Sequence, residues 1–364
     1  MKNKKITLII TVVLLLTTII SGCQELFSDI PTTYETHPTK ISYNIKYGYQ
    51  IICTGTGKYE IKYRCDLPEP IKTTSYSLLY NRDYENISLV NNDFIQWNIS
   101  GTVDATYELG VSAIIESESF LVSDLNGNNA LTIQEINNFY PELIEQYCHK
   151  QSIAPTVFID PSDPDIKTIA SSVLNRAETN NSFVIAKLLF SWLKENIKYQ
   201  IHDGQGDVQP AAVTLQKKTG DCDDLSFLYI SLCRAVDIPA RFIRGYLLQE
   251  EENGEVTATA HAWVEVFVGK LIGNEGWIPI ECSCCATSIQ VDINQNFGVE
   301  DAFHIRLFVD DGSNESLNVS QSGIHIQYYE NREIELRSFV DIENYLELES
   351  KKLVVTKDNT RYYQ

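Results

Sequence analysis

A cysteine at the start of an apolar helix is the feature that most constrains what this chain can fold into. Cys222 follows Gly220 and Asp221, and apolar residues recur at helical spacing from Leu225 to Val236, which predicts a helix with one buried face. The first turn of a helix carries unpaired N–H groups and the positive end of the helix dipole, and both favour a thiolate. The flanking aspartates oppose that effect, so we expect the thiolate to depend on a protonated histidine partner.

Two strands that follow the helix supply that histidine and an acid. Residues 259–268 alternate as a strand that carries His261, residues 269–276 predict a turn, and the return strand leads into Glu281. An antiparallel register of suitable parity places Glu281 beside His261. The three residues then describe a thiol nucleophile, its base and an orienting acid. Asp292 is the alternative for the third position.

These residues resemble the transglutaminase-like superfamily, whose Cys, His and Asp recur in this order on a papain-like core. The resemblance covers roughly Asp160 to Glu281. The matching stretches are AKLLFSWLKENIKY at 186–199, the Gly-Asp-Cys box that ends at Cys222, VDIPAR at 236–241 and HAWVEV at 261–266. The chain departs from the family in having Glu281 where an Asp, often before Pro, is usual. The resemblance implies an α+β fold with a papain-like transglutaminase core at 151–285.

The same resemblance implies the chemistry. Cys222 would attack an amide carbonyl of a peptide or protein, His261 would protonate the departing amine, and Glu281 would hold the imidazole ring, with no cofactor needed for catalysis. Water as acceptor gives a peptidase or amidase, and a primary amine gives a transglutaminase. The competing interpretation is a catalytically inactive, calcium-stabilised surface binding or scaffold protein with the same fold.

The N-terminus predicts export and a lipid anchor. Lys2, Lys4 and Lys5 precede an apolar run from Ile6 to Ile20, which is shorter than a spanning helix requires. Residues 1–22 therefore read as a signal peptide, and the small residues before Cys23 resemble a lipobox that makes Cys23 the lipidated first residue of the mature protein. An uncleaved signal anchor is the alternative. Both place the remainder outside the cytoplasm, tethered to the membrane, where cell-envelope peptides are candidate substrates.

Flanking domains are predicted on both sides of the core. Residues 23–40 are polar and contain two prolines, which indicates a linker. Residues 41–115 show period-two alternation typical of half-buried strands, so we expect an N-terminal all-β, sandwich-like domain. Residues 286–364 are expected as a β-rich extension that completes the core. His304, Arg306 and His325 lie on its predicted strands, and we interpret them as structural rather than as part of a substrate groove.

A second motif lies within residues 116–150, for which we expect an EF-hand-like helix-loop-helix. Six residues occupy positions 1, 3, 5, 7, 9 and 12 of a calcium loop: Asp124, Asn126, Asn128, Ala130, Thr132 and Glu135. These residues could bind a structural Ca²⁺. The alternative is a turn followed by a capped helix, because Thr132 with Glu135 three residues on also fits a capping box.

The net charge of the chain limits the classes of partner that it is expected to bind. The chain has 49 acidic and 29 basic residues and a formal charge of -20. Such a charge repels anionic polymers, which argues against nucleic acid and favours a neutral or cationic substrate.

Overall fold

The computed structural model describes eight segments of the chain: residues 31–68, 73–80, 87–90, 94–201, 208–269, 271–283, 286–321 and 323–364. The predicted signal peptide and Cys23 lie outside these residues. The described residues fall into two compact units, of which the smaller holds the segments up to His37, Ser123–Asn126 and Lys351–Gln364. Within the described segments, no helix combines the length and hydropathy that crossing a membrane requires.

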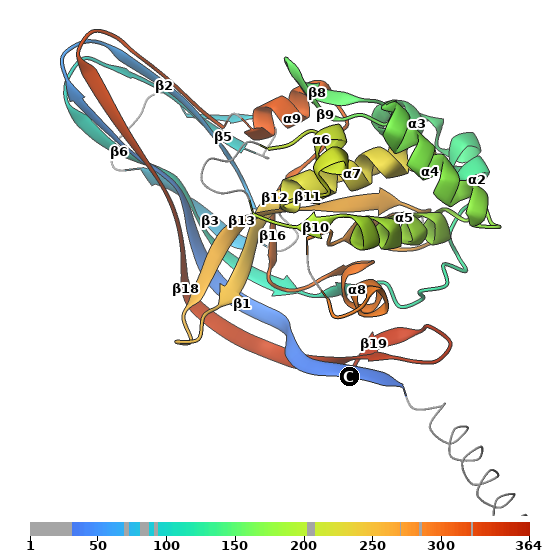
Figure 1. Cartoon of the computed structure of the whole chain (residues 1–364). Helices are drawn as coiled ribbons and strands as arrows, with labels where there is room; N and C mark the ends of the chain where they lie inside the picture. Colours follow the sequence, from blue (N-terminus) through green and yellow to red (C-terminus); the bar gives the residue numbers. More distant parts are fainter. Residues whose placement is uncertain are drawn as a thin grey trace, which may run out of the picture. The chain divides into compact units, whose positions relative to one another are not determined.

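The larger unit contains the four-stranded antiparallel sheet on which the catalytic core is expected. Its strands are β14 (Trp277–Ile280), β13 (Val256–Phe267), β12 (Ala240–Glu250) and β16 (His304–Val309), in that spatial order. Helix α7 (Cys222–Arg234) packs on β12 and β13. Three helices contact α7 and are drawn near it in Figure 1: α4 (Pro164–Arg176), α5 (Ser182–Asn196) and α6 (Ala211–Lys217). This arrangement confirms the predicted α+β class.

Apolar side chains explain why α7 forms the centre of the core. Phe227 and Leu228 are fully buried, and the ring of Phe227 lies 4.8 Å from that of Phe242 on β12. Burying one such side chain contributes about 1.5–3 kcal/mol. The Tyr229 hydroxyl donates to the Ala186 carbonyl of α5 at 2.9 Å. The helix that carries Cys222 is therefore held from two sides.

Two further β-sheets form the sandwich-like part. Strand β1 (Thr32–Gly55) pairs with β6 (Ala105–Glu118), so that Tyr43 lies opposite Ile115. Strand β2 (Tyr59–Asp66) pairs with β5 (Phe94–Gly101) in the second sheet, which β4 (Ile87–Val90) extends, while β3 (Thr73–Tyr80) pairs with β6. Alternate residues of both sheets share one hydrophobic cluster with Leu248, Val256 and Ile305 of the core sheet. The expected β-rich N-terminal region is thus present and packs on the core.

Most strands of the C-terminal extension pair with the sandwich sheets rather than with the core sheet. Strand β16 does complete the core sheet, as predicted. In contrast, β17 (Ile324–Tyr328) pairs with β2, and β18 (Arg332–Val355) lies next to β1. The ion pair of Lys46 with Glu343, at 2.7 Å, connects β1 and β18. The prediction that all of 286–364 completes the core is therefore wrong for these strands, which instead cover open edges of the sandwich sheets.

Two other expectations need correction. Residues 32–40, expected in the linker, are part of β1. No helix precedes the predicted calcium loop within residues 105–121, because β6 continues to Glu118, where Ser117 still pairs with Ile41, and β7 (Phe120–Leu121) follows. Only the second half of the helix-loop-helix is helical, as α2 (Ile133–Phe139) and α3 (Pro141–Tyr147).

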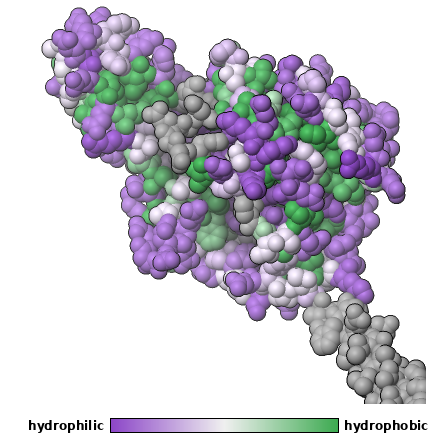
Figure 2. All heavy atoms as spheres, viewed as in Figure 1, coloured by the Kyte–Doolittle hydropathy of each residue, from purple (hydrophilic) through white to green (hydrophobic). Residues whose placement is uncertain are grey.

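The face drawn in Figure 2 is mostly hydrophilic, and hydrophobic residues show in smaller patches.

Candidate active site

A buried carboxylate fixes the start of the helix that carries Cys222. Asp224 accepts the Asp221 backbone N–H at 3.2 Å, and it also accepts the backbone and side-chain N–H groups of Gln209, each at 2.6 Å. A Cβ atom on Gly220 would lie 2.6 Å from the Cβ of Asp224. The Gly-Asp-Cys sequence therefore suits a helix start at which only glycine leaves room for this carboxylate.

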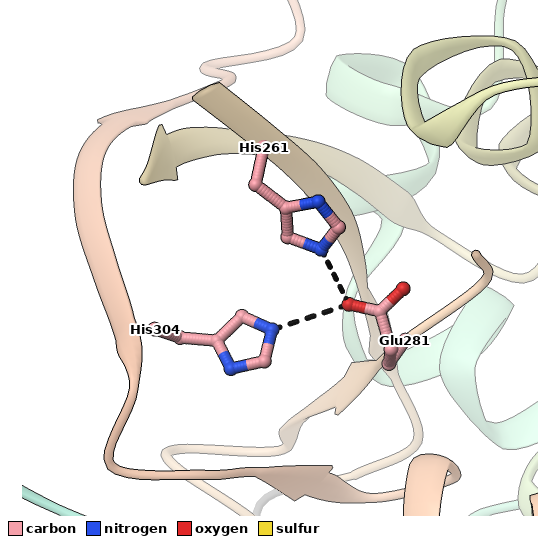
Figure 3. A group of neighbouring side chains, drawn as sticks. All are labelled: His261, Glu281 and His304. Carbon is pink, nitrogen blue, oxygen red and sulfur yellow. Dashed lines mark hydrogen bonds and ion pairs between the residues drawn. The ribbon is translucent and has the colours of Figure 1, made fainter. Parts of the chain in front are cut away.

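His261 and Glu281 meet on one face of the core sheet. The register of β13 with β14 pairs Glu265 with Pro279, so odd-numbered residues of both strands share a face. Glu281 follows β14 by one residue, and its backbone N–H donates to the Asn296 carbonyl at 3.0 Å. His261 Nε2 lies 2.7 Å from Glu281 Oε2, as Figure 3 shows. The strand parity expected from the sequence therefore produces the expected contact.

The sulfur of Cys222 lies beside the same strand. Cys222 is a free thiol whose Sγ donates to Asp223 Oδ1 at 3.9 Å. The backbone N–H of Ala262, the residue after His261, acts to lower the pKa of this thiol. Because His261 Nε2 faces Glu281, Nδ1 is the ring nitrogen left for proton exchange. Helix α7 packs on β13, the strand that carries His261, and the Glu281 carboxylate lies on the Nε2 side of the imidazole.

Electrostatics disfavour a free-standing thiolate. Burial raises the pKa of the Cys222 thiol above its usual range, and the charges of Asp223 and Asp221 raise it further. Burial also raises the pKa of Asp223 to about 6, with Asp221 adding to the effect and Arg244 and His261 opposing it. The helix dipole alone does not ionise this thiol, so its deprotonation requires a base, as the sequence analysis expected.

A second histidine, which the sequence analysis interpreted as structural, shares the carboxylate. His304 at the start of β16 places Nε2 3.1 Å from Glu281 Oε2 (Figure 3). Its Nδ1 lies 2.7 Å from Asp301 Oδ1. The other oxygen of Glu281 accepts the backbone N–H of Ser283 at 2.7 Å and its hydroxyl at 2.5 Å. Nothing local in the sequence signals this arrangement, since it depends on β16 lying next to β12.

The two histidines determine the charge of Glu281. Burial alone would raise its pKa, but His261 and His304 outweigh burial and hold the pKa well below the usual range. Burial likewise disfavours a charged His304, yet Asp301 and Glu281 raise its pKa to about 10. At neutral pH the site therefore contains an ionised Glu281 and a protonated His304.

Asp292, the alternative for the third position, lies elsewhere in the fold. It belongs to α8 (Ile289–Asn296), where Oδ1 is 3.3 Å from Lys194 Nζ and accepts the Asn296 side chain at 2.8 Å. Its side chain is engaged in this ion pair, and Glu281 occupies the place beside His261.

Two groups of residues are relevant to metal binding. His261, Glu281 and His304 each offer one ligand atom, and these atoms lie within 4.8 Å of one another. In the predicted calcium loop, Glu135 forms the capping box of α2, accepting the Thr132 backbone N–H at 2.7 Å. In the smaller unit, Asp124 accepts the Asn126 backbone N–H at 2.8 Å. The capped helix is thus present, and calcium binding stays a prediction.

A cavity of about 230 Å³ lies next to the histidine strand. Its wall includes Ala260, which precedes His261, and Gly245, which is paired with His261 across the sheet. The aromatic part of the wall comes from both the sandwich and the core: Tyr47, Tyr49, Tyr63 and Tyr246. The Asp66 carboxylate in this wall forms ion pairs with two guanidinium groups. Arg64 Nε lies 3.0 Å from Oδ1, and Arg244 Nη2 lies 3.0 Å from Oδ2. The sandwich therefore helps to shape the surroundings of the site.

Sequence comparison identifies the part of the chain that carries this site. Residues 167–282 match the sequence model described as Transglutaminase-like superfamily. Uncharacterized protein YebA of Bacillus subtilis (strain 168) is 37% identical over 75 residues, which are 18% of this chain and 10% of that relative. The match thus spans about a tenth of the relative's length.

One solved structure is similar to this chain over nearly its whole length. A structure described as a proposed cysteine protease from Cytophaga hutchinsonii aligns with a TM-score of 0.52 and 13% identity, covering 92% of this chain and all of that one. The periplasmic domain of TgpA from Pseudomonas aeruginosa aligns over 68% of this chain and 92% of its own, at 10% identity and a TM-score of 0.32. Only the first is similar enough to support the fold. Residues 167–282 are therefore similar to the transglutaminase-like superfamily, and this chain shares its fold with the Cytophaga protein.

Proposed function

We propose that this protein is an extracytoplasmic cysteine acyl-transfer enzyme that acts on amide bonds of peptides or proteins. Cys222 is the nucleophile, His261 the base and acid, and Glu281 the residue that orients the imidazole. The observation that carries the proposal is the 2.7 Å contact of His261 Nε2 with Glu281 Oε2, which leaves Nδ1 for the thiol. A neutral thiol needs such a base to become a nucleophile.

The reaction proceeds in two stages. His261 takes the thiol proton, the sulfur attacks the amide carbonyl, and the imidazolium returns the proton to the leaving amine as the C–N bond breaks. The ionised Glu281 stabilises the imidazolium between these steps. The Cys222 backbone N–H at the start of α7 is the donor best placed for the developing oxyanion. A thioester on Cys222 results.

Water is the proposed acceptor in the second stage. His261 then acts as base toward water, which releases the acid product and the free thiol. The adjacent cavity, at about 230 Å³, is of the size of one peptide side chain, and its tyrosines offer apolar faces with polar edges.

The location of the enzyme is proposed from the sequence. The basic residues before the apolar run, and the small residues before Cys23, support export followed by lipid anchoring. Substrates in the cell envelope follow from that location.

The test is turnover of cell-envelope peptides by the full-length chain in detergent. Mass spectrometry of the products should show amide cleavage that is lost in Cys222→Ala and retained in Cys148→Ala, a matched change at a second free thiol. An added primary amine separates the acceptors, because a crosslinking enzyme incorporates it into product. Cleavage that survives Cys222→Ala would refute the proposal.

The raised pKa of Cys222 favours a second candidate function, an inactive scaffold in which this half-buried thiol is inert. Such a protein turns over no peptide, and its Cys222 reacts with electrophiles at the same slow rate with or without His261. Binding of envelope peptides without product would support it.

A further inference from the structure

Both ring nitrogens of His304 face carboxylate oxygens. Nδ1 lies 2.7 Å from Asp301 Oδ1 and Nε2 lies 3.1 Å from Glu281 Oε2. An ionised carboxylate only accepts hydrogen bonds, so each nitrogen must carry a proton. With both carboxylates ionised, this geometry describes an imidazolium, and the direction of the His304 pKa agrees with it.

Glu281 needs more support than the Asp that is usual at this position. The extra methylene adds a rotatable bond between the backbone and the carboxylate, so the carboxylate can turn away from His261 unless neighbours hold it. Ser283 holds Oε1 through two hydrogen bonds, and His304 donates to Oε2, the oxygen that also contacts His261. His304 and Glu281 are about 95% buried, which strengthens these contacts.

We propose that His304, kept cationic by Asp301, is a positioning residue that fixes the orientation and the charge of Glu281. This inference rests on the proposed function, because it assigns the means by which Glu281 supports His261. Asp301 contacts His304 and acts through it. The charges then alternate along one row, from Asp301 through His304 and Glu281 to the imidazolium of His261.

The alternative for this cluster is a metal centre, since its three ligand atoms lie within 4.8 Å of one another. The contacts favour hydrogen bonding. Separations of 2.7 and 3.1 Å from one carboxylate oxygen to two imidazole nitrogens are those of N–H···O hydrogen bonds. A His304 that is protonated on both nitrogens has no lone pair for a metal.

Removal of the His304 charge should change the pH dependence of the site. The titratable groups that face the cluster are Asp301 before β16, His261 on β13, and Cys222 with Asp223 on α7. An opposite charge at hydrogen-bond distance lowers a carboxyl pKa by about 1 to 3 units. Without the cation the Glu281 pKa rises, so reactivity is lost at a higher pH on the acid side.

The experiment compares His304→Gln and Asp301→Asn with the parent in the full-length chain. The readout is the rate of Cys222 alkylation by iodoacetamide across pH, together with peptide kcat and KM. We expect both variants to lower kcat and the alkylation rate by about 10- to 100-fold, with KM little changed and the acid limb moved upward. Asp301→Asn should match His304→Gln, and the double variant should add nothing further. His325→Gln, on β17, is the matched control and should behave as the parent.

Nuclear magnetic resonance provides a readout that packing alone would not move. The ¹⁵N signals of His304 should show two protonated nitrogens at pH 8 in the parent and a neutral ring in Asp301→Asn. A neutral His304 in the parent, or parent-like pH profiles in both variants, would overturn the inference. Loss of activity on chelation, restored by zinc, would also overturn it by making His304 a metal ligand.

Failure of the proposed function gives a different result. If alkylation of Cys222 is unchanged in His261→Ala, the nucleophile assignment fails regardless of His304. If it falls in His261→Ala and stays at the parent value in His304→Gln, only the further inference fails. Thermal unfolding of each variant excludes misfolding as the cause of a lower rate.

Discussion

Replacing Glu281 with Gln should remove most of the reactivity of Cys222 while leaving the shape of the side chain intact. Oε2 of Glu281 accepts from His261 at 2.7 Å and from His304 at 3.1 Å. Hydrogen bonds to charged groups contribute about 1.5–3 kcal/mol each, so losing both costs about 3–6 kcal/mol. At 1.36 kcal/mol per factor of ten, the rate falls by about 10²- to 10⁴-fold.

The rate should fall because the tautomer of His261 changes, as well as because the negative charge of Glu281 is lost. The Gln amide can donate to His261 Nε2, which places the ring proton on Nδ1 and removes the base from the side of the thiol. The corresponding change in a serine-protease triad lowers kcat by about 10⁴-fold, at the upper end of the range worked out here.

The assay is the second-order rate constant for Cys222 alkylation between pH 5 and pH 10, read by peptide mapping. Glu281→Gln should lower the rate of Cys222 alkylation at pH 7 and shift the onset of alkylation to higher pH. Glu281→Asp keeps the charge with a shorter side chain, so it should retain more reactivity than Glu281→Gln. A Gln variant with the parent rate and parent thermal stability would refute the reasoning.

Three further predictions concern calcium, a buried ion pair and pH. Glu135→Gln keeps the capping box, which accepts Glu or Gln, but it removes a carboxylate that could bind calcium through both oxygens. The difference in melting temperature between chelator and millimolar calcium should therefore vanish in Glu135→Gln. If the parent itself shows no such difference, the predicted calcium site is refuted. Arg234→Met leaves Asp310 buried without the guanidinium that lies 3.2 Å away. It should lower the free energy of unfolding, measured in urea, by about 3–5 kcal/mol, whereas a change below about 1 kcal/mol would contradict this. Because the folded pKa of His304 is about 10 against 6.5 unfolded, its contribution to stability is complete below pH 6.5 and lost as pH rises through 10. His304→Gln should flatten that decline, and an equal decline in both proteins would count against a protonated His304.

Local patterns were enough to predict the centre of the site. Apolar periodicity placed Cys222 at the start of a helix, and period-two alternation placed His261 and Glu281 on one face of a hairpin whose turn is short. These inferences need contacts across only about twenty residues. Strand parity leaves few alternatives over that distance.

Long-range pairing explains what the sequence did not predict. His304 reaches Glu281 because β16 pairs with β12 some sixty residues earlier in the chain. Strand β17 likewise joins β2 across more than two hundred residues. The alternation in such strands indicates a buried face but does not identify the sheet, and so the C-terminal strands were placed with the wrong partner.

The prediction of a helix within residues 116–121 was wrong for a related reason. The calcium-loop spacing suggested a helix before the loop, but alternation in β6 continues to Glu118 and pairs with β1 throughout. The strand pattern was the stronger local signal. The helix after the loop was predicted by its cap, Thr132 with Glu135, which the structure contains.

The most direct test of the central claim is the position of the first label when the folded parent reacts with less than one equivalent of iodoacetamide at pH 7. We expect one modified peptide, containing Cys222, and a sharp fall in its formation when His261 is replaced by Ala. Labelling that is spread slowly over all thiols, including the buried Cys233, and that is unaffected by the His261 change would contradict it.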